Sequence, residues 1–110
     1  MYFSEVTQSH PEGGATEYLL SPRFPDAQTR RVSLVVGVDL TTALTVAGAV
    51  GIYDGGTYLP LNYVATPVAG QPIVFERPFL LGPGVRVYFM TNQATAGDDC
   101  RLFIQGEVLD

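Results

Sequence analysis

A chain of 110 residues fits a single domain, and an apolar content of 46% is enough to build a small core. Charged residues make up only 15% of the chain, the formal net charge is −5, and no lysine occurs. Because phosphates and anionic lipids attract basic stripes, this balance argues against nucleic acid and against a membrane surface as partners.

With so few charges, part of the surface of a small domain is expected to be apolar and to be buried by a partner. The opening residues, MYFSEVTQSH, hold neither a basic region nor a long apolar run, so no signal peptide is expected. Residues 34–53 reach the length of a membrane span, but Asp39 would lie inside it, and two strands joined by a turn are the better interpretation. The single Cys100 excludes an intrachain disulfide, which is consistent with folding in a reducing compartment.

Residues 1–28 are predicted to form an N-terminal arm with surface loops, followed by a β-sandwich domain over residues 29–110. Prolines and a glycine pair interrupt the first segment, and only residues 15–20 have the composition of a short strand. The segment is nevertheless rich in aromatic residues, including Tyr2 and Phe3, whereas disordered tails are poor in them. We therefore expect the arm to pack against its own domain or against a neighbouring subunit.

The rest of the chain alternates short apolar runs with turn residues, and no window shows a helical period. Strands are predicted at 30–38, 44–53, 57–64, 72–76, 85–91 and 100–109. This spacing is typical of a single antiparallel β-sandwich or jelly-roll-like domain. The DGG sequence at 54–56 predicts a tight hairpin turn, and Pro60 predicts an edge position or a bulge in its strand.

Period-two alternation divides each predicted strand into a core face and an outward face. The core face is predicted to hold Val32, Leu34, Val36, Val38, Leu44, Val46, Val50, Ile52, Val85, Val87, Phe89, Leu102, Ile104 and Val108. On the same alternation, Ser33, Val35 and Ala49 are predicted to face outward.

The last two predicted strands are joined by one polar loop over 92–99 and are expected to pair as a hairpin. Their outward apolar side chains, Tyr88, Met90, Phe103 and Leu109, would then share one surface, with Arg86 and Arg101 pairing to acids at its rim. Burial of such apolar side chains stabilises an association, and arginine suits interfaces because its planar head makes bidentate and stacking contacts. This surface, together with Tyr2 and Phe3 of the arm, is predicted to be a protein interface.

No pattern in the chain indicates catalysis, and we expect a non-enzymatic protein with no cofactor and no metal. His10 is the only histidine and stands before a proline in a polar stretch, so neither a catalytic triad nor a histidine pair for a metal is expected. Asp98 and Asp99 precede Cys100 and would raise the pKa of its thiol, which opposes a role as nucleophile. A weak cation site at the two aspartates is kept as a minor alternative.

Tyr53, Tyr58 and Tyr63 cluster around the predicted DGG hairpin. Aromatic side chains on a β-sandwich can stack on sugar rings, so the alternative hypothesis is a carbohydrate-binding module. Packing at the rim of the sandwich or in a subunit contact is the simpler interpretation of the same three residues.

The strand series ending GVRVYFMTNQATAGDDCRLFIQGEVLD and the aromatic arm MYFSEVTQSH give the chain a character that resembles the small auxiliary capsid proteins of tailed bacteriophages. The resemblance rests on no diagnostic motif and extends to other virion β-proteins, so it implies that the alternative carbohydrate-binding module would belong to a phage tail or receptor-binding protein. These decoration or cement proteins imply a non-enzymatic structural role, production in the host cytoplasm, and a place on the capsid surface of the virion. The resemblance further implies a homo-oligomer, a dimer or trimer, that binds the major capsid protein lattice and stabilises the shell.

Overall fold

The computed structural model describes residues 2–11, 16–22, 29–40, 47–92 and 97–109. Within these ranges the chain forms antiparallel strands and no helix. The strands are β1 (Tyr2–Ser9), β2 (Thr16–Leu20), β3 (Arg30–Asp39), β4 (Ala47–Asp54), β5 (Thr57–Val64), β6 (Ile73–Phe75), β7 (Phe79–Leu81), β8 (Arg86–Asn92) and β9 (Cys100–Val108). The predicted all-β sandwich is therefore confirmed.

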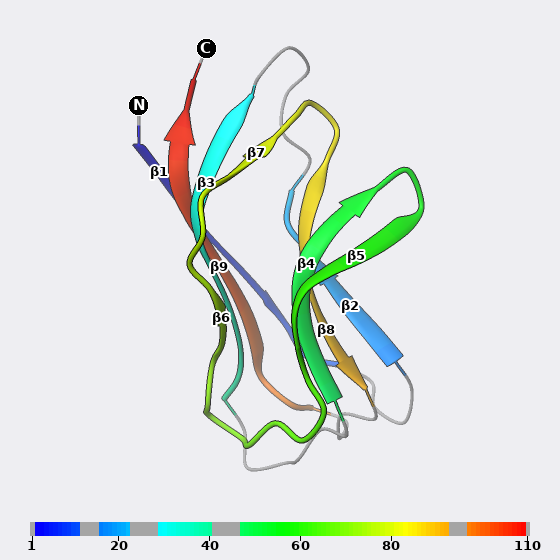
Figure 1. Ribbon diagram of the computed structural model, residues 1–110. Coiled ribbons are helices and arrows are strands. Elements are labelled where there is room, and N and C mark those ends of the chain that lie inside the picture. The colour runs from blue at the N-terminus through cyan, green and yellow to red at the C-terminus, as the bar shows by residue number, and fades with distance from the viewer. Residues whose placement is uncertain (1, 12–15, 23–28, 41–46, 93–96, 110) are drawn as a thin grey trace.

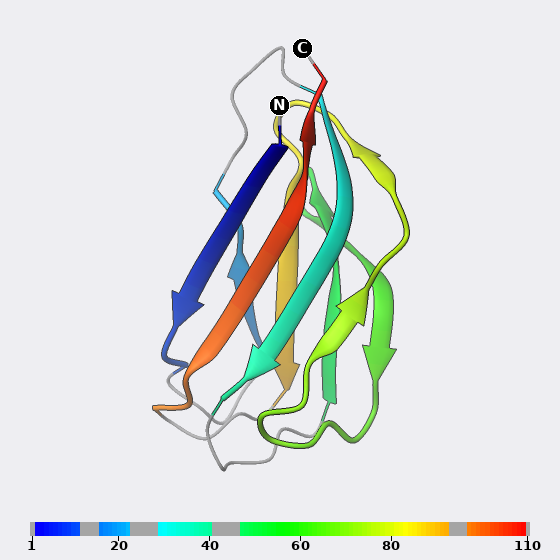
Figure 2. The same ribbon diagram turned by 90° about the vertical axis from the view of Figure 1, so that its left-hand side faces the viewer.

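Two sheets face each other across the core (Figure 1). Sheet A has the strand order β1-β9-β3-β6, with β7 also paired to β3, and sheet B has the order β2-β8-β4-β5. The pairing is nested, since the first strand pairs with the last, the second with the last but one, and β4 with its neighbour β5. Figure 2 shows sheet A from its outer side, with β1 at one edge and β6 and β7 at the other.

The N-terminal segment departs from the prediction of an arm over residues 1–28. β1 pairs with β9 along its whole length, and β2 pairs with β8, so both strands complete the sandwich predicted to begin at residue 29. The short strand predicted at 15–20 is confirmed by β2. The sequence did not predict β1 because its apolar alternation is weak. An edge strand is half exposed, and polar side chains such as Glu5 occupy its inward face.

The six strands predicted after residue 29 all occur in the described ranges, although residues 44–46 of the second lie outside them, and the structure adds the short strand β7. Gly55 and Gly56 have φ angles of 57° and 92°, so the β4–β5 connection is the tight turn that the DGG sequence predicts. Both predictions for Pro60 hold, because β5 is an edge strand and its pairing with β4 shifts register beside that residue.

A bulge in β3 overturns part of the predicted core stripe. The register between β3 and β9 shifts between Val32 and Leu34, which adds one residue to β3 and inverts its alternation from that point. Val35, predicted to face outward, is therefore buried in the core, whereas Leu34 and Val36 lie half-buried on the opposite side.

The predicted hairpin between the last two strands is wrong. β8 lies in sheet B between β2 and β4, and β9 lies in sheet A between β1 and β3. The connection between β8 and β9 therefore crosses from one sheet to the other. A strand's alternation does not identify its partner, so the loop predicted at 92–99 could not by itself distinguish a hairpin from a connection between the two sheets.

The core is formed by side chains of both sheets, and Phe89 of β8 links them. A Cβ atom at Gly37 of β3 would lie 2.4 Å from Cδ1 of Phe89 and 2.8 Å from Cγ1 of Val50. A glycine at this position therefore lets the phenylalanine ring of one sheet lie directly on the backbone of the other. The buried cluster comprises Val32, Val35, Val50, Ile73, Leu81, Val87, Phe89, Cys100, Leu102 and Ile104.

Candidate functional site: a protein-binding face

The outer face of sheet A carries a continuous row of apolar side chains. In the register of the sheet, Val6 of β1 stands beside Phe103 of β9, Phe103 beside Val36 of β3, and Val36 beside Val74 of β6. We call these four residues the apolar row. Val6 is 61% exposed and the other three are half-buried, so the row is open to solvent across the width of the sheet.

Polar groups border the apolar row at both ends of the strands. Toward one end, Gln8 Nε2 donates a hydrogen bond of 2.6 Å to Asp99 Oδ1, and Arg101 Nη2 lies 4.0 Å from the other oxygen of that carboxylate. Toward the opposite end, Arg31 and Glu107 are register partners on β3 and β9. An apolar centre with a polar rim is the usual anatomy of a protein–protein interface.

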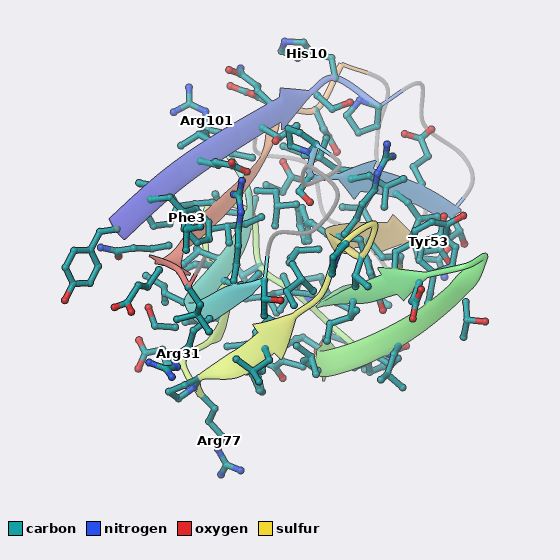
Figure 3. The ribbon with its side chains drawn as sticks, turned by 90° about the horizontal axis from the view of Figure 1, so that it is seen from above. Phe3, His10, Arg31, Tyr53, Arg77 and Arg101 are labelled. Atoms are coloured by element: carbon teal, nitrogen blue, oxygen red, sulfur yellow. The ribbon has the colours of Figure 1, made fainter. Side chains whose placement is uncertain are left out.

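The predicted interface residues do not form one surface. Those of β8 lie in sheet B and the others in sheet A, on opposite sides of the sandwich. Figure 3 shows Arg101 beside β1 and β9, on the far side of the molecule from Tyr53 of β4. One group lies on the outer side of sheet A or at its margin: Tyr2, Arg101, Phe103 and Leu109. The other group lies on sheet B: Arg86, Tyr88 and Met90.

Tyr88 is not available as a direct contact residue, because its own chain covers it. Its side chain is only 2% exposed. The ring lies edge-on to Tyr18 at 5.7 Å between centroids and to Tyr58 at 5.1 Å. A Cβ at Gly51 of β4 would lie 2.2 Å from the backbone oxygen of Leu59 and 2.9 Å from Cε1 of Tyr88, so this glycine leaves room for both the neighbouring strand and the ring. Tyr88 therefore belongs to the packing of the outer side of sheet B.

Two of the three predicted sugar-stacking residues use their rings within the same cluster. Tyr58 stacks on Tyr18 with 3.8 Å between centroids and an interplanar angle of 20°, and Tyr53 lies 4.7 Å from Tyr58. Burial and the neighbouring tyrosines raise the pKa of both Tyr58 and Tyr88 above the ordinary value of 10.0. Packing among neighbours, the simpler interpretation, thus describes Tyr53 and Tyr58, while Tyr63 remains 58% exposed.

Phe3 and Glu5 attach β1 to the sandwich through Arg30 of β3. Arg30 Nη1 donates a hydrogen bond of 2.9 Å to Glu5 Oε1, and Arg30 Cζ lies 4.6 Å from the centroid of the Phe3 ring. Phe3 also packs against the core, which makes it an internal contact instead of the free interface residue that was predicted. No sequence signal indicated this ion pair, because its members are far apart in the chain and belong to different strands.

Cys100 is buried at the start of β9 among acidic side chains. Burial, followed by the charges of Asp39, Asp98 and Asp99, raises the pKa of its thiol to about 12. The direction agrees with the sequence-based expectation and keeps the sulfur protonated at neutral pH. His10 lies exposed just after β1, and no group of three acidic, histidine or cysteine side chains in the described ranges could hold a metal ion.

Comparison with protein-family models found no match, and comparison with curated protein sequences found none either. Among solved structures, the chain is similar to the crystal structure of dimeric latent PorU from Porphyromonas gingivalis, with a TM-score of 0.37 and 10% sequence identity. That similarity covers 99% of this chain and 13% of the other, so the chain spans a small part of the larger protein. A likeness at this level transfers no function. The described ranges contain no helical segment with the length and hydropathy of a membrane span.

Proposed function

We propose that this protein is a non-enzymatic structural protein of a virion, a decoration or cement protein that binds the capsid lattice of a tailed bacteriophage through the outer face of sheet A. The observation that carries the proposal is the apolar row of Val6, Phe103, Val36 and Val74, which spans all the strands in the order of that sheet. All four side chains of the row are apolar, and charged residues make up only 15% of the chain.

The nested pairing of the strands supports the same proposal. Sheets with the orders β1-β9-β3-β6 and β2-β8-β4-β5 support a jelly-roll-like wrapping as part of the proposal, since that architecture recurs in viral capsid and lectin domains. Fold alone does not assign a function. The architecture therefore adds support only together with the exposed row.

The energetics favour a partner with many copies. Full burial of a valine or phenylalanine side chain contributes about 1.5–3 kcal/mol, and association costs about 4–15 kcal/mol in lost freedom. Val36, Phe103 and Val74 are already half-buried in the free protein, so each gains less than the full amount. One apolar row thus supports a modest affinity for each copy, which a repeating lattice and an oligomeric binder would multiply.

Co-sedimentation with empty shells assembled from the major capsid protein encoded in the same genome tests the proposal. The wild-type protein should sediment with the shells, and Phe103→Asp should reduce the bound fraction at least about tenfold, since it buries a charge in the contact. Tyr63→Asp is the matched control on the outer side of sheet B and should bind as the wild type does. Absence of wild-type binding, or loss of binding by the Tyr63 variant alone, would refute the proposal.

A carbohydrate-binding module is the second candidate, and one observation favours it. Tyr63 and Tyr18 are both exposed on sheet B, beside the aromatic cluster. On a glycan array this candidate predicts binding that Tyr63→Ala removes and Phe103→Asp preserves. If Phe103→Asp instead removes shell binding and the Tyr63 variant keeps it, the capsid function is favoured.

A further inference from the structure

The free edges of the two sheets differ in how well they are protected from pairing with another strand. β5 contains Pro60 and a register shift, β2 has five residues, and β6 and β7 have three residues each. Short, broken or proline-containing edge strands are the usual protection against unwanted pairing. Three of the four edges therefore resist the addition of a further strand.

β1 lacks these protections. It has eight residues, no proline and no lysine, and its register with β9 runs from Tyr2 to Ser9 without a shift. In the described residues no other strand pairs with its second side. An inward-pointing charge can also protect an edge, but Arg30 neutralises the one that Glu5 supplies. β1 thus presents a long and regular edge without an uncompensated charge.

We propose that β1 pairs with β1 of a second copy of this chain, antiparallel about a two-fold axis at Val6, so that the two copies of sheet A form one continuous sheet. A second copy is the occupant that fits because the strand is complementary to itself in this register. The proposal goes beyond the proposed function, since the dimer forms whether or not a capsid shell is the partner.

The register follows from the side chains of β1. Facing residues in an antiparallel pair point to the same side of the sheet, so the longest symmetric overlaps are centred on Glu5 or on Val6. Centring on Glu5 sets each exposed Val6 opposite the polar Ser4, so neither valine gains an apolar cross-strand partner. Centring on Val6 pairs the two valines and sets Glu5 opposite Thr7, whose hydroxyl can donate to the carboxylate.

The polar positions and the exposed apolar residues agree with the Val6 register. Ser4 then faces Gln8, two uncharged side chains that can form a hydrogen bond. Val6, which is 61% exposed in the single chain, is covered by its own copy. The apolar rows of the two copies meet at the axis and become one row twice as long, which presents two linked binding faces to a repeating partner.

Cysteine cross-linking tests both the dimer and its register. Val6→Cys places two thiols opposite each other at the axis, where the Cα separation of about 4.5–5.5 Å suits a disulfide. Ser4→Cys is the matched control, since it lies on the same outer face but is set opposite Gln8. Under mild oxidation we expect a covalent dimer of the Val6 variant and about tenfold less of it from the Ser4 variant. Cys100 does not compete, because it is buried with a pKa of about 12.

Sedimentation velocity of the unmodified protein provides the second measurement. The wild type should show concentration-dependent dimers, and Val6→Lys should abolish them while the β-type circular dichroism is retained, because two ammonium groups would meet at the axis. A wild type that stays monomeric at high concentration, or equal cross-linking of the Val6 and Ser4 variants, overturns the proposal. Cross-linking of Phe103→Cys in preference to Val6→Cys would show face-to-face association instead.

The two proposals fail in different ways. Phe103→Asp combined with Val6→Cys should still cross-link, although Phe103→Asp loses shell binding. If the dimer forms and no shell is bound, the capsid function is refuted and the β1 pairing is supported. If shells are bound by a protein that never cross-links, the β1 pairing is refuted and the capsid function is supported.

Discussion

Arg30 and Glu5 form an ion pair with 2.9 Å between Nη1 and Oε1, and this pair joins the third strand of the chain to the first across β9, on the inward face of sheet A. The guanidinium group also lies over the ring of Phe3, so it is held from two positions of β1. β1 needs this attachment for two reasons. Among the described strands it pairs with β9 alone, and it has few apolar side chains on its inward face.

Glu5→Ala should lower the free energy of unfolding by about 2 kcal/mol, since it leaves a buried guanidinium without its carboxylate. The loss should be smaller than for a fully buried pair because the Glu5 side chain remains 27% exposed. Urea denaturation measures the change, and Ser4→Ala on the exposed face of β1 is the control, with an expected change within about 0.5 kcal/mol. Equal effects of the two substitutions would show that the ion pair does not hold β1.

Gly37→Ala should destabilise the sandwich by about 1–3 kcal/mol through overpacking, because the added Cβ would lie 2.4 Å from the Phe89 ring. Thermal unfolding should show a lower Tm, by about 4–8 °C for each kcal/mol in a domain of this size. Gly82→Ala is the control, since a Cβ there meets no atom within 4 Å. A second substitution, Phe89→Leu, should recover part of the loss caused by Gly37→Ala; without recovery, the clash with Phe89 is not its cause.

Tyr88→Ala should cost about 3–5 kcal/mol of folding free energy, as expected for a large aromatic side chain in a packed cluster. The prediction rests on its 2% exposure and on its ring contacts with Tyr18 and Tyr58. Tyr63→Ala, on the same side of sheet B but exposed, should change stability little. If Tyr88→Ala left urea unfolding unchanged and altered only association, Tyr88 would be a contact residue after all.

The stability of the native state should fall as the pH rises above about 9, and Cys100 should account for part of the fall. The thiol has an ordinary pKa of 9.0, which the fold raises to about 12 through burial. Below pH 9 the thiol is protonated in both states and the full stability is present; between the two values the unfolded state loses its proton first, at a cost of up to about 1.4 kcal/mol per pH unit.

Denaturation of the wild type and of Cys100→Ala at about pH 8 and about pH 11 measures this dependence. The wild type should lose about 2–3 kcal/mol more than the variant over that interval. Tyr58 and Tyr88 also have raised pKa values and act in the same direction in both proteins, so the difference isolates the thiol. Parallel pH profiles of the two proteins would contradict a raised thiol pKa.

Local sequence determined where most of the strands and turns lie. The strands after residue 29 follow from short apolar runs between turn residues, and the DGG turn and the position of Pro60 follow from backbone restrictions that each residue carries by itself. β1 and β7 were harder to recognise, because an edge strand with polar inward residues and a strand of three residues have little periodicity. These local signals were sufficient for the all-β class.

Tertiary structure decided which faces and strands meet, and with them the candidate site. The bulge in β3 inverted the alternation and moved Val36 to the outer side of sheet A, although its apolar neighbours predicted a core position. The separation of β8 from β9 assigned Phe103 to one face and Tyr88 to the other. Hydrogen bonds between strands distant in the chain set both outcomes, and the period of a single strand contains no information about its partner or about an inserted residue.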